Sequence, residues 1–179
     1  MEDIPAFTTS IYQGFQTAQI TELLTQYGPI SEIWIDIPGI LGMSYRTFLY
    51  QHMSGLQPDA AILMNSAFTT GETYDTELAW PADLIAMERR MPPATGHVKW
   101  RTINGKKYYL PGEVCDPIGK EWFFIAGDNP RPDQELAEQY LACHQRGTNF
   151  LLNVPPDKTG RIPEMYIKAL MRLKKNVNL

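Results

Sequence analysis

Residues 30–39 read ISEIWIDIPG, and this stretch decides the fold class. Ile30, Ile33, Trp34 and Ile35 form a nearly continuous apolar run that ends on a single carboxylate, Asp36. A short apolar run bounded by turn residues is typical of a buried strand. An ionised group at the end of such a strand is costly unless it is paired or used. Asp36 is therefore either a structural cap that accepts nearby N–H groups or a functional residue.

Two further stretches repeat this pattern along the chain. AAILMN at 60–65 ends on Asn65, and NFLLNV spans 149–154. Segments with helical periodicity separate the runs, which predicts βα units in a parallel sheet covered by helices. We expect parallel strands at 30–36, 60–65, about 108–114 and 149–154.

Two segments between these strands have patterns that predict other elements, a helix and a hairpin. Pro81 could open a helix that runs to about Arg90, since proline is favoured at the first helical position. Asn104-Gly105 lies between two strand-like runs, which is a strong signal for a β-hairpin. We therefore expect a hairpin inserted into an α/β unit, with Glu88 on the surface of the helix.

Composition narrows the function classes. The chain has 179 residues and a net charge of -4, so it lacks the basic character of a nucleic-acid binder. The sequence has no apolar run long enough to span a membrane and no signal peptide at its start. The phosphate-loop motifs are missing, and His52, His97 and His144 are too dispersed for a metal site. We expect no metal and no cofactor, and one compact unit over residues 1–179.

Carboxylates remain the best candidates for catalysis. Active sites of parallel α/β folds lie at the carboxyl ends of the strands, where we expect Asp36, Asn65 and the polar residues of GEVCDP at 112–117. Paired carboxylates in such a place indicate glycoside hydrolysis before any other reaction.

Three blocks of the sequence resemble one enzyme family. QITELLTQYGPISEIWIDIPG, which starts at Gln19, is similar to the nucleophile segment of the α-L-fucosidases of glycoside hydrolase family 29. YLPGEVCDPIGKEWFF and GTNFLLNVPPDKTGRIPE resemble two later blocks of the family, in the same order. The resemblance implies a (β/α)8 TIM-barrel fold, of which this chain is about the C-terminal half.

The resemblance also implies roles for particular residues. Asp36 falls on the nucleophile of a retaining mechanism with a fucosylated glycan as substrate. Glu113 is the favoured acid/base, with Glu72 and Glu77 as alternatives because one branch of the family takes this residue from the preceding loop. Trp34 and Trp122 are expected either to face the methyl side of the sugar or to pack in the core.

The chain departs from the family in two respects. The family usually has glycine after the nucleophile, where this chain has Ile37-Pro38. The upstream strands that carry fucose-binding residues do not precede Asp36 here. We therefore expect either self-association or assembly with the missing N-terminal half, and a parent enzyme that is periplasmic, secreted or lysosomal. The alternatives are an inactive truncated remnant and a sugar-binding or self-associating α/β module.

Overall fold

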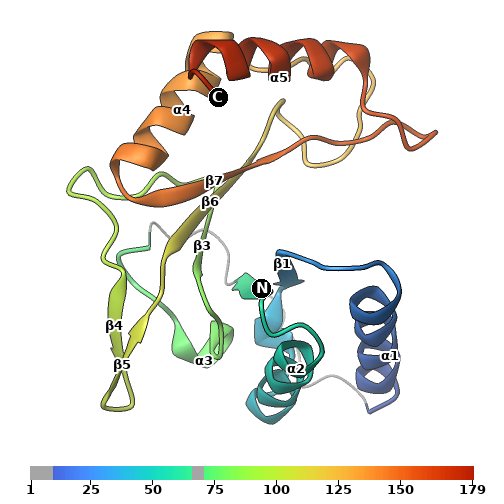
Figure 1. Cartoon of the computed structure of the whole chain (residues 1–179), viewed down its shortest axis with the longest axis vertical. Helices are drawn as coiled ribbons and strands as arrows, with labels where there is room; N and C mark the ends of the chain where they lie inside the picture. Colours follow the sequence, from blue (N-terminus) through green and yellow to red (C-terminus); the bar gives the residue numbers. More distant parts are fainter. Residues whose placement is uncertain (1–9, 66–70) are drawn as a thin grey trace, which may run out of the picture.

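The structure is a computed structural model that describes residues 10–65 and 71–179. It is a mixed α/β arrangement in which helices alternate with parallel strands (Figure 1). The elements are α1 (Ser10–Gln26), β1 (Glu32–Asp36), η1 (Pro38–Ile40), α2 (Met43–Leu56), β2 (Ala61–Asn65), α3 (Thr76–Ala79), β3 (Ile85–Glu88), β4 (Trp100–Ile103), β5 (Lys106–Tyr109), β6 (Gly112–Pro117), α4 (Asp133–Gln145), β7 (Thr148–Asn153) and α5 (Glu164–Asn176).

The strands form two parallel ladders. β1 pairs with β2, and β6 lies between β3 and β7. A parallel bridge between Leu63 and Leu84 joins the two ladders. The Asp83 carboxylate makes a second contact between them, because it accepts a hydrogen bond from the Ile62 amide at 2.8 Å. The strand order is therefore β1-β2-β3-β6-β7. Among the described residues β1 and β7 have one neighbour each, so the sheet does not close into a barrel.

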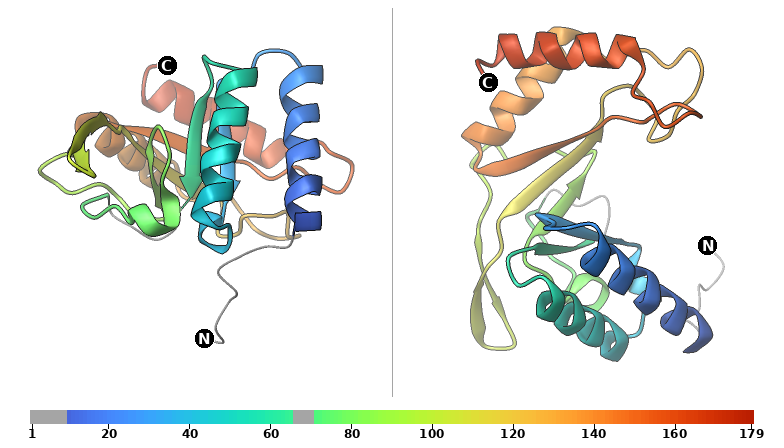
Figure 2. Two further views of the ribbon diagram at one scale, coloured as in Figure 1. Left: turned by 90° about the horizontal axis from the view of Figure 1, so that it is seen from below. Right: turned by 45° about the vertical axis from the view of Figure 1, so that its right-hand side comes forward.

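Two helical layers cover the outside of this sheet. α1 and α2 lie side by side next to β1 and β2, and α4 and α5 cover the β6–β7 end (Figures 1 and 2). Ile62 and Met64 of β2 pack under the first helix pair, whereas Leu63 between them joins a separate cluster with Leu84 and Ala86. Because side chains alternate along a strand, Leu63 and its neighbours mark the opposite face of the sheet.

The parallel strands predicted at 30–36, 60–65 and 149–154 are confirmed, and so is the hairpin. Asn104 and Gly105 both have positive φ, at 50° and 77°, as a two-residue hairpin turn that matches the strand twist requires. The hairpin of β4 and β5 projects from the sheet, at the lower left of Figure 1.

One predicted helix is wrong, and one predicted strand has other bounds. The segment from Pro81 to Arg90 contains β3 and no α-helix, because Leu84–Met87 is a four-residue apolar run that β2 and β6 bury from both sides. The parallel strand expected at about 108–114 is β6, which pairs with β3 and β7 but starts only at Gly112, after the hairpin strand β5 has ended at Tyr109. Pro111, which has no N–H to donate to a ladder, lies at the break.

Candidate active site

Asp36 is the last residue of β1, and its side chain is exposed. Its Oδ1 accepts hydrogen bonds from the backbone N–H of Ile37 at 3.0 Å and from Nδ2 of Asn65 at 2.8 Å. Asn65 is the register partner of Asp36 at the end of β2, which explains why the two side chains meet. The carboxylate is thus oriented by the sheet and remains open to a ligand.

The turn after Asp36 explains how the chain accommodates Ile37. This residue has φ 49° and ψ 48°, which is the left-handed conformation that glycine adopts without strain. Pro38 then opens the 3-10 helix η1. The backbone therefore follows a glycine-like path although a β-branched residue occupies the position.

A second carboxylate, Glu88, shares the same amide. Nδ2 of Asn65 donates to Oε2 of Glu88 at 2.9 Å as well as to Asp36. The two carboxylate oxygens therefore both lie within hydrogen-bond distance of one nitrogen atom. Glu88 ends β3 and does not lie on the surface of a helix, where the sequence pattern had predicted it. The apolar run Leu84–Met87 was the signal that could have found it.

A pocket of about 600 Å³ surrounds these groups. It opens at the carboxyl ends of β1, β2, β3, β6 and β7, and both Trp34 and Trp122 line it. The remaining lining residues are Asp36, Asn65, Glu88, Cys115, Phe123, Leu151, Leu152, Asn153 and Val154. Burial raises the pKa of the Cys115 thiol to about 12, with Glu113 and Glu88 adding to the shift, so this thiol stays protonated.

Glu113 does not belong to this pocket. It is the second residue of β6, at the amino end of the strand, and its side chain is fully buried. It accepts hydrogen bonds from Trp34 Nε1 at 3.2 Å and Asn149 Nδ2 at 2.7 Å, and it lines a separate pocket with Glu32. The expectation that Glu113 lies at the same strand ends as Asp36 is wrong, because β6 starts only at Gly112.

Glu32 and Glu113 form a second carboxyl pair at that amino end. Burial of Glu32, followed by the repulsion from Glu113, raises the pKa of Glu32 to about 7. Trp34 Nε1 donates to both carboxyl groups, at 2.7 Å to Glu32 Oε1 and at 3.2 Å to Glu113 Oε1. This pair lies on the same face of the sheet as Asp36, because Glu32 and Asp36 are four residues apart on β1, but at the opposite ends of the strands.

Glu72 and Glu77 lie in the loop between β2 and β3, and both are exposed. Glu77 is on the short helix α3, whose Asp75 cap accepts from the N–H of Glu77 at 2.9 Å. α3 packs against η1, the turn that follows Asp36. The buried guanidinium of Arg46 joins the two by donating to the carbonyls of Glu77 and Pro38. Glu77 is therefore near the rim of the Asp36 site.

The described residues hold no cluster of three or more side chains suited to a metal ion. Within the same ranges, no helix is long and apolar enough to cross a membrane.

A parallel α/β fold with two carboxylates at the carboxyl ends of its strands defines a class to which many glycoside hydrolases belong. A profile of the α-L-fucosidase family matches residues 3–178. The chain belongs to the α-L-fucosidase family.

Comparisons with individual proteins agree with this family. The chain is 29% identical to α-L-fucosidase 1 of Arabidopsis thaliana over 89% of its own length and 33% of that protein. Among solved structures, α-L-fucosidase isoenzyme 1 of Paenibacillus thiaminolyticus superposes with a TM-score of 0.71 at 23% identity, over 97% of this chain and 40% of that one.

The α-L-fucosidase AlfC of Lactobacillus casei, solved with its α-L-fucose product, superposes with a TM-score of 0.67 at 24% identity, over 90% of this chain and 44% of that one. One mutant of the same enzyme was solved with 4-nitrophenyl α-L-fucopyranoside and also with Fucα(1,6)GlcNAc. The structural neighbours are fucosidase catalytic domains of the TIM-barrel type, and this chain spans 40–44% of the length of the two chains named.

Proposed function

We propose that this chain carries the catalytic residues of a retaining α-L-fucosidase that releases terminal α-L-fucose from glycans. One observation carries the proposal: the amide of Asn65 bridges Asp36 and Glu88 at the mouth of a pocket lined by two tryptophans. The Asp36 and Glu88 carboxyl groups share one hydrogen-bond donor and are therefore neighbours, as the roughly 5–5.5 Å between the carboxyl groups of retaining glycosidases requires.

In this mechanism Asp36 is the nucleophile. Its carboxylate attacks the anomeric carbon of the fucoside while the bond to the departing oxygen breaks, and a protonated carboxyl group gives its proton to that oxygen. The same group, now ionised, takes a proton from water, whose oxygen attacks the anomeric carbon and frees Asp36. Trp34 and Trp122 supply an apolar wall for the methyl side of the sugar.

We propose Glu88 as the acid/base, because it lines the pocket of Asp36 and shares the Asn65 amide with it. Glu77 is the second candidate, since α3 holds it beside the turn after Asp36 and its exposed side chain could reach a leaving group at the rim. Glu113, which the family resemblance favoured, lies at the opposite ends of the strands, and Glu72 is exposed in the loop before α3.

We further propose that residues 1–179 form the C-terminal part of a (β/α)8 barrel. The described ranges supply five parallel strands in barrel-like order, and a full barrel has eight. Preceding strands would then cover the outer edge of β1 and complete the fucose site. A secreted, periplasmic or lysosomal location of the parent enzyme rests on the resemblance alone and stays a prediction.

The test compares four matched variants: Asp36→Ala, Glu88→Gln, Glu77→Gln and Glu113→Gln. Each is assayed, in this chain and in the chain extended by a complete N-terminal half, on two fucosides with good and poor leaving groups. Asp36→Ala should abolish turnover, and added azide should restore part of it by filling the vacated space. Loss of the acid/base should slow the substrate with the poor leaving group most, because that oxygen needs the proton.

The outcomes separate the assignments. If Glu77→Gln shows the leaving-group dependence and Glu88→Gln does not, Glu77 is the acid/base and Glu88 a binding residue. Near-full activity of Asp36→Ala would make Asp36 a structural cap. If neither assembly hydrolyses either substrate although both fold, the chain is a non-catalytic remnant of the family.

A further inference from the structure

The Trp34 indole lies between the catalytic pocket, which holds Asp36, and the Glu32–Glu113 carboxyl pair. Glu32, Trp34 and Asp36 alternate along β1, so their side chains lie on one face of the sheet. The Trp34 ring lines the catalytic pocket together with Asp36. Its Nε1 donates to the carboxyl pair, at 2.7 Å to Glu32 Oε1 and at 3.2 Å to Glu113 Oε1. A movement of either carboxyl group can therefore be transmitted through this N–H to a wall of the catalytic pocket.

The hydrogen bond from Trp34 to Glu113 crosses the sheet. β2 and β3 lie between β1 and β6, so the indole reaches over two strands to its acceptor. Glu113 is fixed on the far side, since it is fully buried and its Oε2 accepts from Asn149 Nδ2 on β7 at 2.7 Å. The bond thus ties β1, the strand of Asp36, to β6 and β7, which line the catalytic pocket from the other side.

The two carboxyl groups compete for this single donor. An indole has one N–H, and both Glu32 and Glu113 accept from it. A proton on Glu32 removes the competition, because a protonated carboxyl group can donate to Glu113 and still accept from the indole. Burial, the repulsion from Glu113 and a hydrogen bond with Glu113 together raise the pKa of Glu32 to about 7, although the bond from Trp34 opposes them. The pair therefore changes charge near neutral pH.

The two members of the pair differ in their freedom to move. Glu32 is partly exposed and lines an open pocket of about 720 Å³, whereas Glu113 is fully buried. Two ionised carboxylates beside one donor repel each other, and only Glu32 has room to turn toward solvent. After this movement the Trp34 indole keeps only its longer bond, the one to Glu113.

Four other titratable side chains line the pocket beside the pair. They are Asp83 before β3, Lys99 and Tyr109 of the hairpin segment and His144 of α4. None of them is among the causes that shift the pKa of Glu32. The change of charge in this pocket near neutral pH is therefore set by the carboxyl pair itself.

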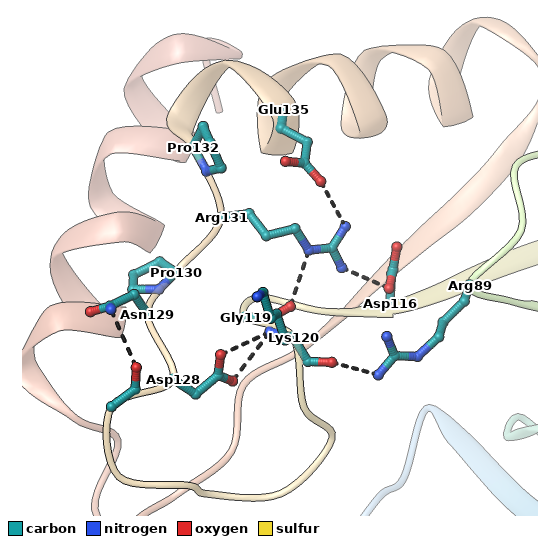
Figure 3. Close-up of a pocket in the computed structure, with 11 residues that line it drawn as sticks. Arg89, Asp116, Gly119, Lys120, Asp128, Asn129, Pro130, Arg131, Pro132 and Glu135 are labelled. Atoms are coloured by element: carbon teal, nitrogen blue, oxygen red, sulfur yellow. Dashed lines mark hydrogen bonds and ion pairs between the residues drawn. The ribbon is translucent and has the colours of Figure 1, made fainter.

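The neighbouring strands carry three further groups near the pair. Cys115 of β6 and Glu88 of β3 lie on the same face, nearer the carboxyl ends, and burial raises the pKa of the Cys115 thiol so that it stays protonated. Asp116 lies on the opposite face of β6, because successive side chains of a strand alternate. There it forms an ion pair with Arg131 at 2.6 Å (Figure 3). None of the three shifts the pKa of Glu32.

We propose that Glu32 and Glu113 are positioning residues for the catalytic pocket: while they share a proton they hold the Trp34 indole in place, and the loss of that proton loosens it. This assignment rests on the proposed function, and it adds that sugar binding weakens as the pH rises through neutrality. The chemical steps stay with Asp36 and its acid/base partner.

The first measurement follows the indole N–H signals of the ¹⁵N-labelled chain by NMR from about pH 5 to about pH 9. Trp34→Phe identifies the signal of Trp34. This signal should shift with a midpoint near pH 7 in the wild type and stay constant in Glu32→Gln, whose amide donates to Glu113 without titrating. Glu164→Gln, at an exposed position of α5, is the matched control and should titrate as the wild type does.

The second measurement determines KM and kcat for 4-nitrophenyl α-L-fucopyranoside at the two ends of this pH range, in this chain and in the chain extended by a complete N-terminal half. At the high pH the KM of the wild type should be about three- to tenfold above that of Glu32→Gln, which corresponds to the loss of one hydrogen bond. At the low pH the two KM values should agree. The pH dependence of kcat should be the same in both proteins, because the catalytic carboxyl groups are unchanged.

A Trp34 signal that does not titrate, or that titrates equally in Glu32→Gln, would overturn the positioning role, and so would equal KM values at the high pH. Glu113→Gln should move the midpoint of the Trp34 signal to lower pH, since the repulsion that raises the pKa of Glu32 is removed. If the wild type hydrolyses no fucoside while the indole signal behaves as expected, the proposed function fails and the hold of the pair on Trp34 stands.

Discussion

Replacement of Arg46 by alanine should remove a large part of the stability of this chain, about 3–5 kcal/mol. Arg46 is on α2, and its side chain is buried, with a relative exposure of 2%. Nε donates to the Trp80 carbonyl at 3.1 Å, and Nη1 donates to the carbonyls of Pro38 at 3.2 Å and Leu41 at 2.5 Å. Nη2 donates to the Glu77 carbonyl.

The magnitude follows from these four charged hydrogen bonds. Hydrogen bonds to a charged group contribute about 1.5–3 kcal/mol each, so the four together contribute about 6–12 kcal/mol. Burial of the guanidinium opposes this gain by several kcal/mol, and the same burial lowers the pKa of Arg46. Truncation removes the donors and leaves buried carbonyls without partners, which places the net loss in the stated range.

Urea unfolding of the wild type, Arg46→Ala and Arg46→Lys measures this loss. The lysine variant should fall between the other two, because a single ammonium cannot reach both segments that the planar guanidinium joins. Arg90→Ala is the control, since Arg90 is exposed and its loss should change the unfolding free energy by less than about 0.5 kcal/mol.

Amide hydrogen exchange locates the effect. In Arg46→Ala the N–H groups of Leu41 and Trp80, which close the two turns next to the guanidinium, should lose protection before those of β2. A loss of less than about 1 kcal/mol in Arg46→Ala would refute the argument, since it would mean that water replaces all four bonds at no cost.

Three further predictions concern stability and assembly. Burial and Glu113 raise the folded-state pKa of Glu32 to about 7, so the folded chain holds this proton more tightly than the unfolded chain does. The unfolding free energy should therefore fall as the pH rises from 5 to 8, and Glu32→Gln should flatten this dependence. An equally steep pH dependence in the variant would contradict the assignment. Ile37→Gly should stabilise the chain by up to about 1 kcal/mol, because the left-handed strain of about 1–2 kcal/mol that it relieves exceeds the cost of the unfolded-state entropy that glycine adds. Ile40→Gly in the same turn removes packing and should destabilise, so thermal melts that give Ile37→Gly the lower midpoint of the two would refute this. The isolated chain should self-associate, because β1 and β7 each leave an outer edge unpaired among the described residues, and sedimentation of a compact monomer with one cooperative melt would count against it.

The features read correctly from the sequence are those with a local cause. A buried strand that ends on Asp36 follows from an apolar run next to turn residues, and the hairpin follows from the freedom of Asn104-Gly105 to adopt positive φ. The parallel pairing of β1 with β2 follows from the helix between them, since a strand pair joined through a helix runs in one direction. Each of these signals lies within a few residues of the feature that it predicts.

The features that the sequence did not reveal depend on residues far away along the chain. β3 is a strand because β2 and β6 enclose it, although Pro81 and the charges after it fit a helix start and end equally well. Whether Glu113 lies at the amino or the carboxyl end is set by where β6 begins to pair with β3 and β7, and no local pattern encodes that register. Glu88 reaches Asp36 only through Asn65 on the strand between them, so the candidate catalytic pair exists only once β1, β2 and β3 stand side by side.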